Sequence, residues 1–470
     1  MRYTALTIGP IYEALSLAEK TRGIWAASYM FSNLMRDALN NLEDKSAAIS
    51  PSVNKLNAKQ SAAGLFNDRA FLRGDRAEEL KAAYEKARDK LIGMIAAANP
   101  NGDRAKIAAF CKRFFTYAII VKDVADGVNP LLAFNELAAA EQEPSIAQNG
   151  EGVNYLLEFF QNINGSKLKE IAYGERSGSF KSLPRIAAHG LINGKEASFD
   201  FDDKDIDDTA IYESLQKDKS FRQLYKYIAI VYADGDNMSK TLSALSVEKT
   251  TEFSAKLLDF SRRAAERIEG FGGLPVYAGG DDLLFFAPVY SGEKTIFALL
   301  EELGADFESA TDGKSTLSFG LSISYYKFPL REALEFARNE LFVKAKNAKG
   351  KNALAFIIQK HSGQSFESVL SKSELSDLIE IAQNETDENT ALPRGLHYKL
   401  AQHETLINQT PDNRLRALFD NLFNEEIHQT RFKASLDASL SLLIKLRSSD
   451  ETDATKKLWA ILSAVKLLRS

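Results

Sequence analysis

The fold is decided by a short stretch near the middle of the chain, Tyr277-Ala278-Gly279-Gly280-Asp281-Asp282-Leu283-Leu284-Phe285-Phe286. It predicts a strand, a tight turn and a second strand, because its apolar end is typical of a buried strand and its glycines free the backbone for a turn. The turn puts Asp281 and Asp282 at the tip of a hairpin. Adjacent carboxylates repel each other unless a counterion is present, and Mg²⁺ or Mn²⁺ suits an oxygen-only pair. The alternative is an ordinary hairpin, since glycine and aspartate are common turn residues.

A second acidic turn lies upstream of this hairpin. The β-branched and aromatic run 227–233 ends in Asp234-Gly235-Asp236-Asn237. If the two strands are neighbours in one sheet, Asp234 converges with Asp281 and Asp282, and the three side chains form a carboxylate metal site. The alternative is that the acidic turn only caps the next helix.

The periodicity around these motifs predicts one small α+β domain. Apolar residues spaced by three and four over 253–268 and 296–307 predict helices, and strict alternation over 317–325 predicts a strand. A further helix over 334–341 and a short strand at 353–358 complete the order β-α-β-β-α-β. This is the ferredoxin-like pattern, which hosts many functions, so the function has to be argued from the site.

The chain opens on a predicted strand and helix. The strand over 3–11 ends in an Ile-Gly-Pro-Ile turn, and the helix carries Trp25, Ser28, Tyr29 and Ser32 on one face. Two interpretations stay open. Either Ser28 and Tyr29 face a cleft between domains and hold a nucleotide base, or the helix simply packs on its own sheet.

Composition excludes several classes of protein. The 470 residues carry a net charge of −5, which argues against a generally basic nucleic-acid-binding surface. The single cysteine, Cys111, excludes an internal disulfide and a four-cysteine zinc site. Because there is neither a secretion signal nor an apolar run of about 18 residues, we expect a cytoplasmic protein without a membrane span.

Three other segments give coarser expectations. Residues 104–122 are predicted to be helical. The acidic run 199–208 is interpreted as a solvated linker rather than a calcium loop, because it lacks the spacing of an EF-hand. Residues 361–470 are predicted to be helical, and the expected domains are therefore 1–215, 216–360 and 361–470.

Several lysines follow the predicted helix 334–341, in the run Lys344-Ala345-Lys346-Asn347-Ala348-Lys349-Gly350-Lys351. Cations at the C-terminal end of a helix complement its dipole. They also suit a triphosphate lying opposite the carboxylates, and we expect Lys346 and Lys351 to contact it.

Together these motifs resemble the large polymerase/cyclase subunit of type III CRISPR effector complexes, in its Cmr-type branch. The resemblance is carried by the two acidic turns, by the Ile-Gly-Pro turn and by the helix with the pattern Thr-Arg-x-x-Trp-x-x-Ser-Tyr. It implies an α+β fold with two ferredoxin-like palm domains, a helical insertion and a helical C-terminal domain. Many members begin with a nuclease domain built around a His-Asp dipeptide. No histidine here precedes an aspartate, so no nuclease activity is expected.

The resemblance also implies the residues of the site. Asp234, Asp281 and Asp282 are expected to be catalytic and to bind two Mg²⁺ or Mn²⁺ ions, with the Gly235 carbonyl as a further ligand. No zinc is expected, because the family's zinc cluster needs cysteines that this chain lacks. The expected nucleotide contacts are Gly279, Gly280, Asp236, Asn237, Lys346, Lys351, Ser28 and Tyr29.

The implied substrate is ATP, and the implied product is an adenylate second messenger, either a cyclic oligoadenylate or an AMP conjugate with S-adenosylmethionine. The implied partners are other CRISPR effector subunits, a CRISPR RNA and the target RNA that activates synthesis. Two alternatives stay open, a free-standing nucleotide cyclase and a catalytically silent scaffold that binds RNA. Three converging carboxylates argue against the scaffold, which has no physical need for them.

Overall fold

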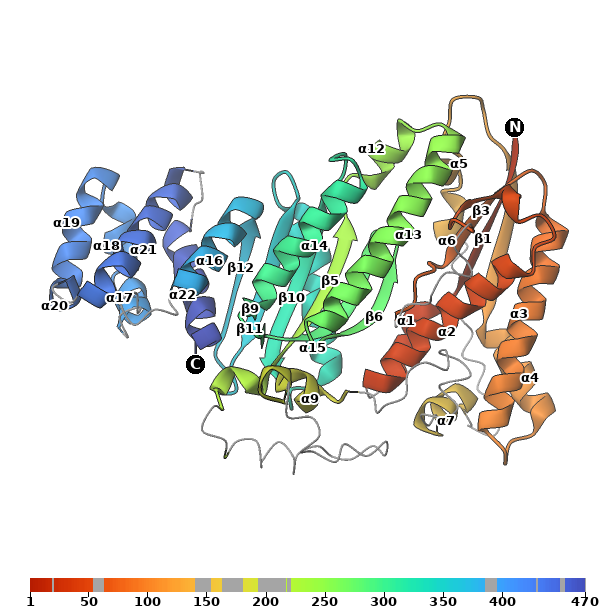
Figure 1. Cartoon of the computed structure of the whole chain (residues 1–470), viewed down its shortest axis with the longest axis horizontal. Helices are drawn as coiled ribbons and strands as arrows, with labels where there is room; N and C mark the ends of the chain where they lie inside the picture. The colour runs from red at the N-terminus through yellow and green to blue at the C-terminus, as the bar shows by residue number, and fades with distance from the viewer. Residues whose placement is uncertain are drawn as a thin grey trace.

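The computed structural model describes residues 1–18, 21–53, 63–139, 154–162, 181–192, 217, 221–384, 395–427, 430–448 and 453–469. Within these ranges two large β-sheets lie next to each other, the chain also forms a small two-stranded sheet, and a group of helices follows the second large sheet (Figure 1). The N-terminal sheet and the C-terminal helices lie at opposite ends of the long axis (Figure 1). The acidic run 199–208 lies outside the described residues.

The first sheet has the strand order β2-β3-β1-β4, and all its neighbouring strands are antiparallel, as in a ferredoxin-like fold. Leu6, Ile8 and Leu72 on one face pack against the long helices, while Tyr3 and Phe71 on the other face join a smaller core with the short helices. The elements are β1 (Arg2–Gly9), α1 (Ile11–Ser16), α2 (Thr21–Asn40), β2 (Ala48–Ser50), β3 (Arg69–Arg73), α3 (Ala77–Ala98), α4 (Arg104–Phe114), β4 (Thr116–Asp123), α5 (Pro130–Ala133), α6 (Glu136–Ala139) and α7 (Tyr155–Asn162).

The helix predicted over 104–122 is wrong in its second half. Helix α4 ends at Phe114, and the following residues form β4, which pairs along its whole length with β1. The run 116–121 is rich in β-branched and aromatic residues, which fit a pleated, half-buried surface better than a helix. Pairing with β1, at the N-terminus of the chain, makes these residues a strand.

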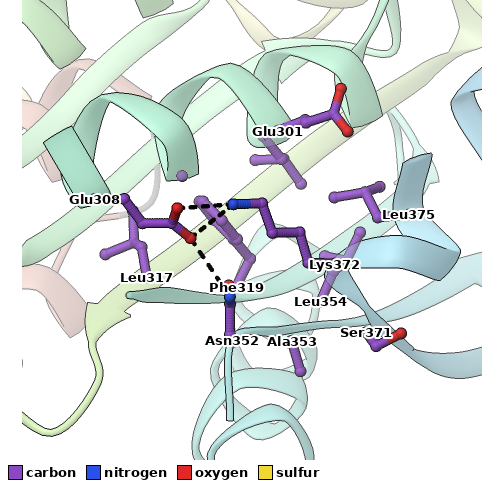
Figure 2. A pocket seen from close by; sticks show the side chains of 12 residues that line it. Glu301, Glu308, Leu317, Phe319, Asn352, Ala353, Leu354, Ser371, Lys372 and Leu375 are labelled. Carbon is purple, nitrogen blue, oxygen red and sulfur yellow. Dashed lines mark hydrogen bonds and ion pairs between the residues drawn. The ribbon is translucent and has the colours of Figure 1, made fainter. Parts of the chain in front are cut away.

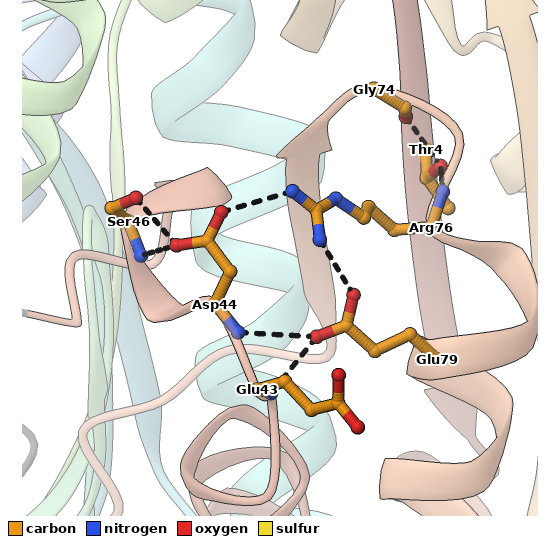
Figure 3. A network of polar contacts seen from close by, with 7 residues as sticks. All are labelled: Thr4, Glu43, Asp44, Ser46, Gly74, Arg76 and Glu79. Carbon is orange, nitrogen blue, oxygen red and sulfur yellow. Dashed lines mark hydrogen bonds and ion pairs between the residues drawn. The ribbon is translucent and has the colours of Figure 1, made fainter.

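A polar network fixes the start of α3 (Figure 3). The Arg76 guanidinium donates to Asp44 at 2.9 Å and to Glu79 at 3.0 Å, and the Arg76 backbone N–H donates to Thr4 Oγ1 at 2.8 Å. Thr4 Oγ1 in turn donates to the Gly74 carbonyl at 2.8 Å. These contacts join β1, the connection after α2, and the first turn of α3.

The second sheet has the order β12-β11-β10-β5-β7-β6, and its strands β10, β5, β7 and β6 repeat the ferredoxin-like arrangement. The predicted α+β class with two such domains is confirmed. The elements of this second domain are β5 (Tyr227–Gly235), α12 (Met238–Ser243), α13 (Val247–Gly270), β6 (Leu274–Gly279), β7 (Asp282–Pro288), β8 (Tyr290–Ser291), β9 (Lys294–Thr295), α14 (Ile296–Ala310), β10 (Leu317–Tyr325), α15 (Leu330–Asn339), β11 (Ala353–Gln359) and β12 (Ser365–Ser371).

The two faces of this sheet pack differently. Val231 and Phe285 face helices α13 and α14. Ile230 and Leu284 face the opposite way, into the large core that also contains Trp25 of α2, so this face lies toward the first domain. Two short helices, α9 (Leu183–Ala187) and α10 (His189–Ile192), belong to the same core.

A strand occurs where only helix was predicted. Ser365–Ser371 forms β12 and pairs antiparallel with β11, extending the second sheet. Phe366 and Leu370 are buried while Glu367 is exposed, an alternation that is short and interrupted by serines. The helices that follow are α16 (Lys372–Asn384), α17 (Leu396–Gln402), α18 (Glu404–Gln409), α19 (Asp412–Leu422), α20 (Asn424–Ile427), α21 (Thr430–Ser448) and α22 (Ala454–Arg469).

The segment before β3 contacts the second sheet at the outer edge of β6. Gly64 forms a parallel bridge with Tyr277, and the Ala278 N–H donates to the Gly64 carbonyl at 2.9 Å. The same segment is held to α2, because the Phe66 N–H donates to Ser32 Oγ at 2.9 Å. A side chain at Gly64 would place Cβ 2.8 Å from Ser32 Cβ, so only glycine lets the segment lie between α2 and β6.

In the described part of the chain, no helix has the length and apolar character that crossing a membrane requires.

Candidate active site

The three predicted carboxylates come together at one end of the second sheet. In the antiparallel pair β5–β7, Ala233 lies opposite Leu283, so the next residues in register, Asp234 and Asp282, are directly opposite each other. Both fall on the sheet face that packs toward the first domain, because side chains alternate along a strand. Asp281 lies at the turn, close to β5, since a Cβ on Gly235 would be 2.8 Å from both Cβ and Oδ2 of Asp281.

The hairpin tip is held by a serine that sequence reasoning missed. The Gly280 N–H donates to Ser261 Oγ of α13 at 2.9 Å, and Ser261 is fully buried. Gly280 has φ +71°, a conformation that favours glycine. At Gly279 a Cβ would lie 2.1 Å from the Tyr277 hydroxyl, so a side chain there would collide with that ring. The fold itself therefore requires glycine at both positions, apart from the nucleotide contacts that were predicted for them.

The carboxylates interact electrostatically with one another. Burial and the charge of Asp234 raise the pKa of Asp281 to about 6. Burial, the charge of Asp281 and a hydrogen bond to Asp234 hold the pKa of Asp282 well above its ordinary range. Excess negative charge is thus gathered at this sheet end.

A fourth carboxylate approaches from the first domain. Asp68, just before β3, adds to the negative charge felt by Asp282 and by Tyr277. Burial and these carboxylates raise the pKa of Tyr277 well above its usual value. No sequence pattern near Asp68 indicates this contact, because Asp68 reaches the site only through the packing of one domain on the other.

Lys346 neutralises the end of β5 instead of facing outward. Its ammonium donates to the carbonyls of Asp234 at 2.7 Å and Gly235 at 2.8 Å and to Asp236 Oδ1 at 2.9 Å, and it forms an ion pair with the Asp234 carboxylate. In this arrangement the ammonium is taken up by protein oxygens, including the Gly235 carbonyl that was expected to bind metal, and the phosphate contact predicted for Lys346 stays a prediction.

Asp236 was predicted to contact the nucleotide, but it is fully buried. Its Oδ2 accepts hydrogen bonds from Thr316 Oγ1 at 2.8 Å, from Ser318 Oγ at 2.8 Å and from the Asn352 N–H at 3.0 Å. With Lys346 on Oδ1, its acceptor sites are used within the protein. Asp236 is therefore a structural anchor that joins β5, β10 and the start of β11.

Asn237 and Lys351, which were also predicted to contact the nucleotide, lie close to Asp236. Asn237 is exposed, has φ +58° and precedes α12. Lys351 and Asn352 have φ +54° and +46°, and this left-handed pair turns the chain so that the Asn352 N–H meets Asp236. The nucleotide contacts predicted for Asn237 and Lys351 stay predictions.

Ser28 and Tyr29 do not line an open cleft. Each side chain is only 3% exposed, and the Tyr29 ring stacks on Trp25 with 4.6 Å between ring centroids. The predicted contact with a base stays a prediction, and this burial agrees with the packing interpretation. The reason is that α2 lies between its own sheet and β6, so this polar-looking face is inside a shared core.

The donor set suits a hard divalent cation. The candidate ligands are carboxylate and carbonyl oxygens, as Mg²⁺ and Mn²⁺ prefer, and the glycine at 235 leaves space beside Asp281. In the ranges that the structure describes, no three His, Cys, Asp or Glu side chains are grouped as metal ligands. Asp234 is instead paired with Lys346 and Asp282, so binding of metal requires these side chains to exchange partners.

A separate pocket lies between α14, β10, β11 and the start of α16, and its lining includes none of the three carboxylates (Figure 2). Glu308 and Lys372 form an ion pair across it at 2.7 Å, and Asn352 Nδ2 donates to Glu308 at 3.4 Å. Asn352 thus connects this pocket to the Asp236 anchor.

Comparison with known proteins agrees with this architecture. The family model described as Cas10/Cmr2, second palm domain, matches residues 227–355, and the model described as CRISPR-associated protein Cmr2, N-terminal, matches residues 3–118. The chain is 33% identical over 172 residues to the CRISPR system Cmr subunit Cmr2 of Pyrococcus furiosus, an alignment that covers 31% of this chain and 20% of that protein.

Solved structures share the fold. A type III-B Cmr-beta complex in its apo state contains a chain with a TM-score of 0.60 and 11% identity, over 90% of this chain and 77% of that one. A Csm1–Csm4 cassette in complex with cA4 gives a TM-score of 0.54 and 13% identity, over 100% of this chain and 70% of that one. The chain belongs to the Cas10/Cmr2 family of type III CRISPR complexes. Its aligned segment spans about a fifth of the Pyrococcus relative.

Proposed function

We propose that the chain is an RNA-activated nucleotidyltransferase that uses ATP and two divalent metal ions to make an adenylate second messenger. The observation that carries this proposal is the placement of Asp234 opposite Asp282, with Asp281 beside Gly235, on the face that packs toward the first domain. The related cassette in complex with cA4 supports a product of the cyclic oligoadenylate class. An AMP conjugate with S-adenosylmethionine is the variant that the same site would make.

The proposed metal ligands are Asp234, Asp281, Asp282 and the Gly235 carbonyl. Bound Mg²⁺ or Mn²⁺ would supply the positive charge that acidifies a ribose 3′-hydroxyl and neutralises the reacting phosphates. The protein supplies position: Ser261 fixes the hairpin tip, and Lys346 fixes the end of β5. Asp234 and Asp282 would both act as ligands in their deprotonated form. No protein nucleophile is needed, since this chemistry depends on positioning and charge.

The proposed setting is the cytoplasm, in an assembly with other CRISPR effector subunits, a CRISPR RNA and a target RNA. A second candidate, a silent scaffold in that assembly, is favoured by one observation. Lys346 already pairs with Asp234, and the described residues hold no preassembled group of three metal-ligating side chains.

The test is product analysis by mass spectrometry on the assembled, target-bound complex, incubated with ATP and Mg²⁺, with and without S-adenosylmethionine. The test variant is Asp281→Ala/Asp282→Ala. The matched control is Asp437→Ala, which removes an exposed carboxylate paired with Arg416 in the helical tail. We expect adenylate products from the wild type and the control only. Absence of ATP turnover in the wild-type complex would refute the proposal in favour of the scaffold.

A further inference from the structure

The second sheet has one end that lies away from the carboxylates, and cations gather there. Tyr325, the last residue of β10, pairs with Tyr227, the first residue of β5, whereas Asp234 lies near the other end of β5. Strand β11 runs parallel to β10, so Lys360, which directly follows β11, lies at the Tyr325 end.

Helix α22 ends at the same place and brings a second lysine to it. The helix contacts β12, and Arg222, shortly before β5, donates to the Leu468 carbonyl at 2.6 Å. On the last turns of α22, Lys466 Nζ lies 3.2 Å from His397 Nε2 of α17. Burial and the charges of Lys466 and Lys360 lower the pKa of His397, and burial and the charge of Lys466 lower the pKa of Lys360. The three side chains therefore lie close together, and we call Lys360, His397 and Lys466 the basic cluster.

The basic cluster has no carboxylate partner among the residues that the structure describes. Other lysines of the C-terminal helices do pair with carboxylates, namely Lys399, Lys445, Lys456 and Lys457. Lys466 suits the dipole at the C-terminal end of α22, but Lys360 and His397 belong to other elements. Because neighbouring cations repel one another, an anion bound among them would remove an unfavourable interaction.

An exposed aromatic ring directly follows two members of the basic cluster. His361 follows Lys360, and its ring stacks on Tyr325 with 4.3 Å between ring centroids. His361 is exposed, so its ring is not covered on both faces. Tyr398 follows His397 and is 75% exposed. Proteins that bind single-stranded nucleic acid combine cations, which contact the phosphates, with aromatic rings, on which the bases stack.

We propose that the basic cluster binds the phosphates of a single-stranded nucleic acid and that His361 stacks on one of its bases. A duplex suits this surface less well, because its bases are already stacked on one another. The attraction is local, since the chain as a whole carries a net charge of −5. This surface lies at the opposite end of the sheet from Asp234, so it is separate from the candidate active site and does not depend on the proposed nucleotide chemistry.

The phosphate contacts are tested by fluorescence anisotropy of a labelled single-stranded oligouridylate, titrated with the purified full chain at several salt concentrations. The test variant is Lys360→Gln/Lys466→Gln. The matched control is Lys256→Gln/Lys445→Gln, which removes the same charge from lysines that each pair with an aspartate. Each phosphate contact to a single strand adds about 0.7 to the slope of log affinity against log salt concentration. We therefore expect this slope to fall by about 1.4 in the test variant and to keep its wild-type value in the control.

The stacking contact is tested separately. We expect His361→Ala to weaken binding of the oligouridylate by about 5- to 150-fold, the value of one base–aromatic stack. His361→Tyr should bind as tightly as the wild type, because it keeps an aromatic ring. Tripolyphosphate has no base, so its affinity, measured by calorimetry, should be the same in the wild type and in both variants.

Equal salt slopes in the lysine test variant and its control would overturn the proposal, as would a wild type that does not bind the oligouridylate. If His361→Ala weakened tripolyphosphate binding as much as oligouridylate binding, the stacking contact would be refuted. Displacement of the oligouridylate by oligoglutamate, at the same concentration of charge, would assign the basic cluster to an acidic protein partner instead. None of these results alters the product analysis with Asp281→Ala/Asp282→Ala, which tests the proposed function on its own.

Discussion

Replacing Lys346 with methionine should destabilise the sheet end that carries the candidate site. Asp236 is fully buried, and the substitution leaves its charge with three hydrogen bonds but no cation. Removing one partner of a buried ion pair costs about 3–5 kcal/mol, because the other charge stays buried without compensation. The carbonyls of Asp234 and Gly235 also lose their donor, which adds about 1 kcal/mol each at most.

The assay is hydrogen exchange measured by mass spectrometry, without divalent ions, on peptides covering β5 and β10. It reports the local free energy of opening of these strands. Asp236→Asn and the double variant Asp236→Asn/Lys346→Met complete a cycle. We expect Lys346→Met to lower the opening free energy by about 3–7 kcal/mol, and the double variant to lose clearly less than the sum of the single losses.

The matched control is Lys256→Met, which breaks the exposed pair with Asp312 and should cost less than about 1 kcal/mol. The reasoning fails if Lys346→Met behaves like this control. It also fails if the two single losses simply add, because the buried charge of Asp236 would then not be the cause.

Three further predictions follow from the described contacts. Gly235→Ala places Cβ 2.8 Å from Asp281, so we expect weaker Mn²⁺ binding by calorimetry, and unchanged affinity would contradict the contact. The pKa of Asp281 is raised from its ordinary value of 3.8 to about 6, so the protonated side chain stabilises the folded, metal-free protein. This contribution to the free energy of unfolding is complete below pH 3.8 and is lost as the pH rises through about 6. Mg²⁺ should therefore raise the melting temperature more at pH 7.5 than at pH 5, and equal shifts would count against it. Cys111 is buried and its pKa is raised to about 12, so a disulfide reagent at pH 8 should label it only after unfolding, which rapid labelling of the native protein would disprove.

The sequence was sufficient to predict the strands and the hairpin that carry the carboxylates. Their signals are local: alternation over 317–325, an apolar run after Asp282, and glycines at a turn. Asp234 could be placed at the end of a strand because the apolar run 227–233 stops directly before it. The register that sets it opposite Asp282 then follows from the ferredoxin-like order.

The remainder depended on contacts between residues far apart in the chain. Lys346 and Asp236 meet across 110 positions, and no pattern near either residue reveals the pairing. Ser28 looks like a cleft residue on a helical wheel, but β6 covers that face. Likewise, 365–371 became a strand because β11 offered it an edge, which the serine-rich segment itself does not indicate, whereas the β-branched residues of 116–121 carried a strand signal that the helical interpretation passed over.

The bridge between Gly64 and Tyr277 has a consequence for how the protein can be divided. Strand β6 is the last in its sheet, and the segment around Gly64 covers its outer edge beside the Gly-Gly-Asp-Asp turn. A fragment that kept only the second sheet would present that edge, with its unpaired backbone groups, to any other strand. Self-association would then begin beside the carboxylates. We therefore expect an isolated palm to aggregate more readily than the whole chain and to be a poor substitute for it in any assay of nucleotide chemistry.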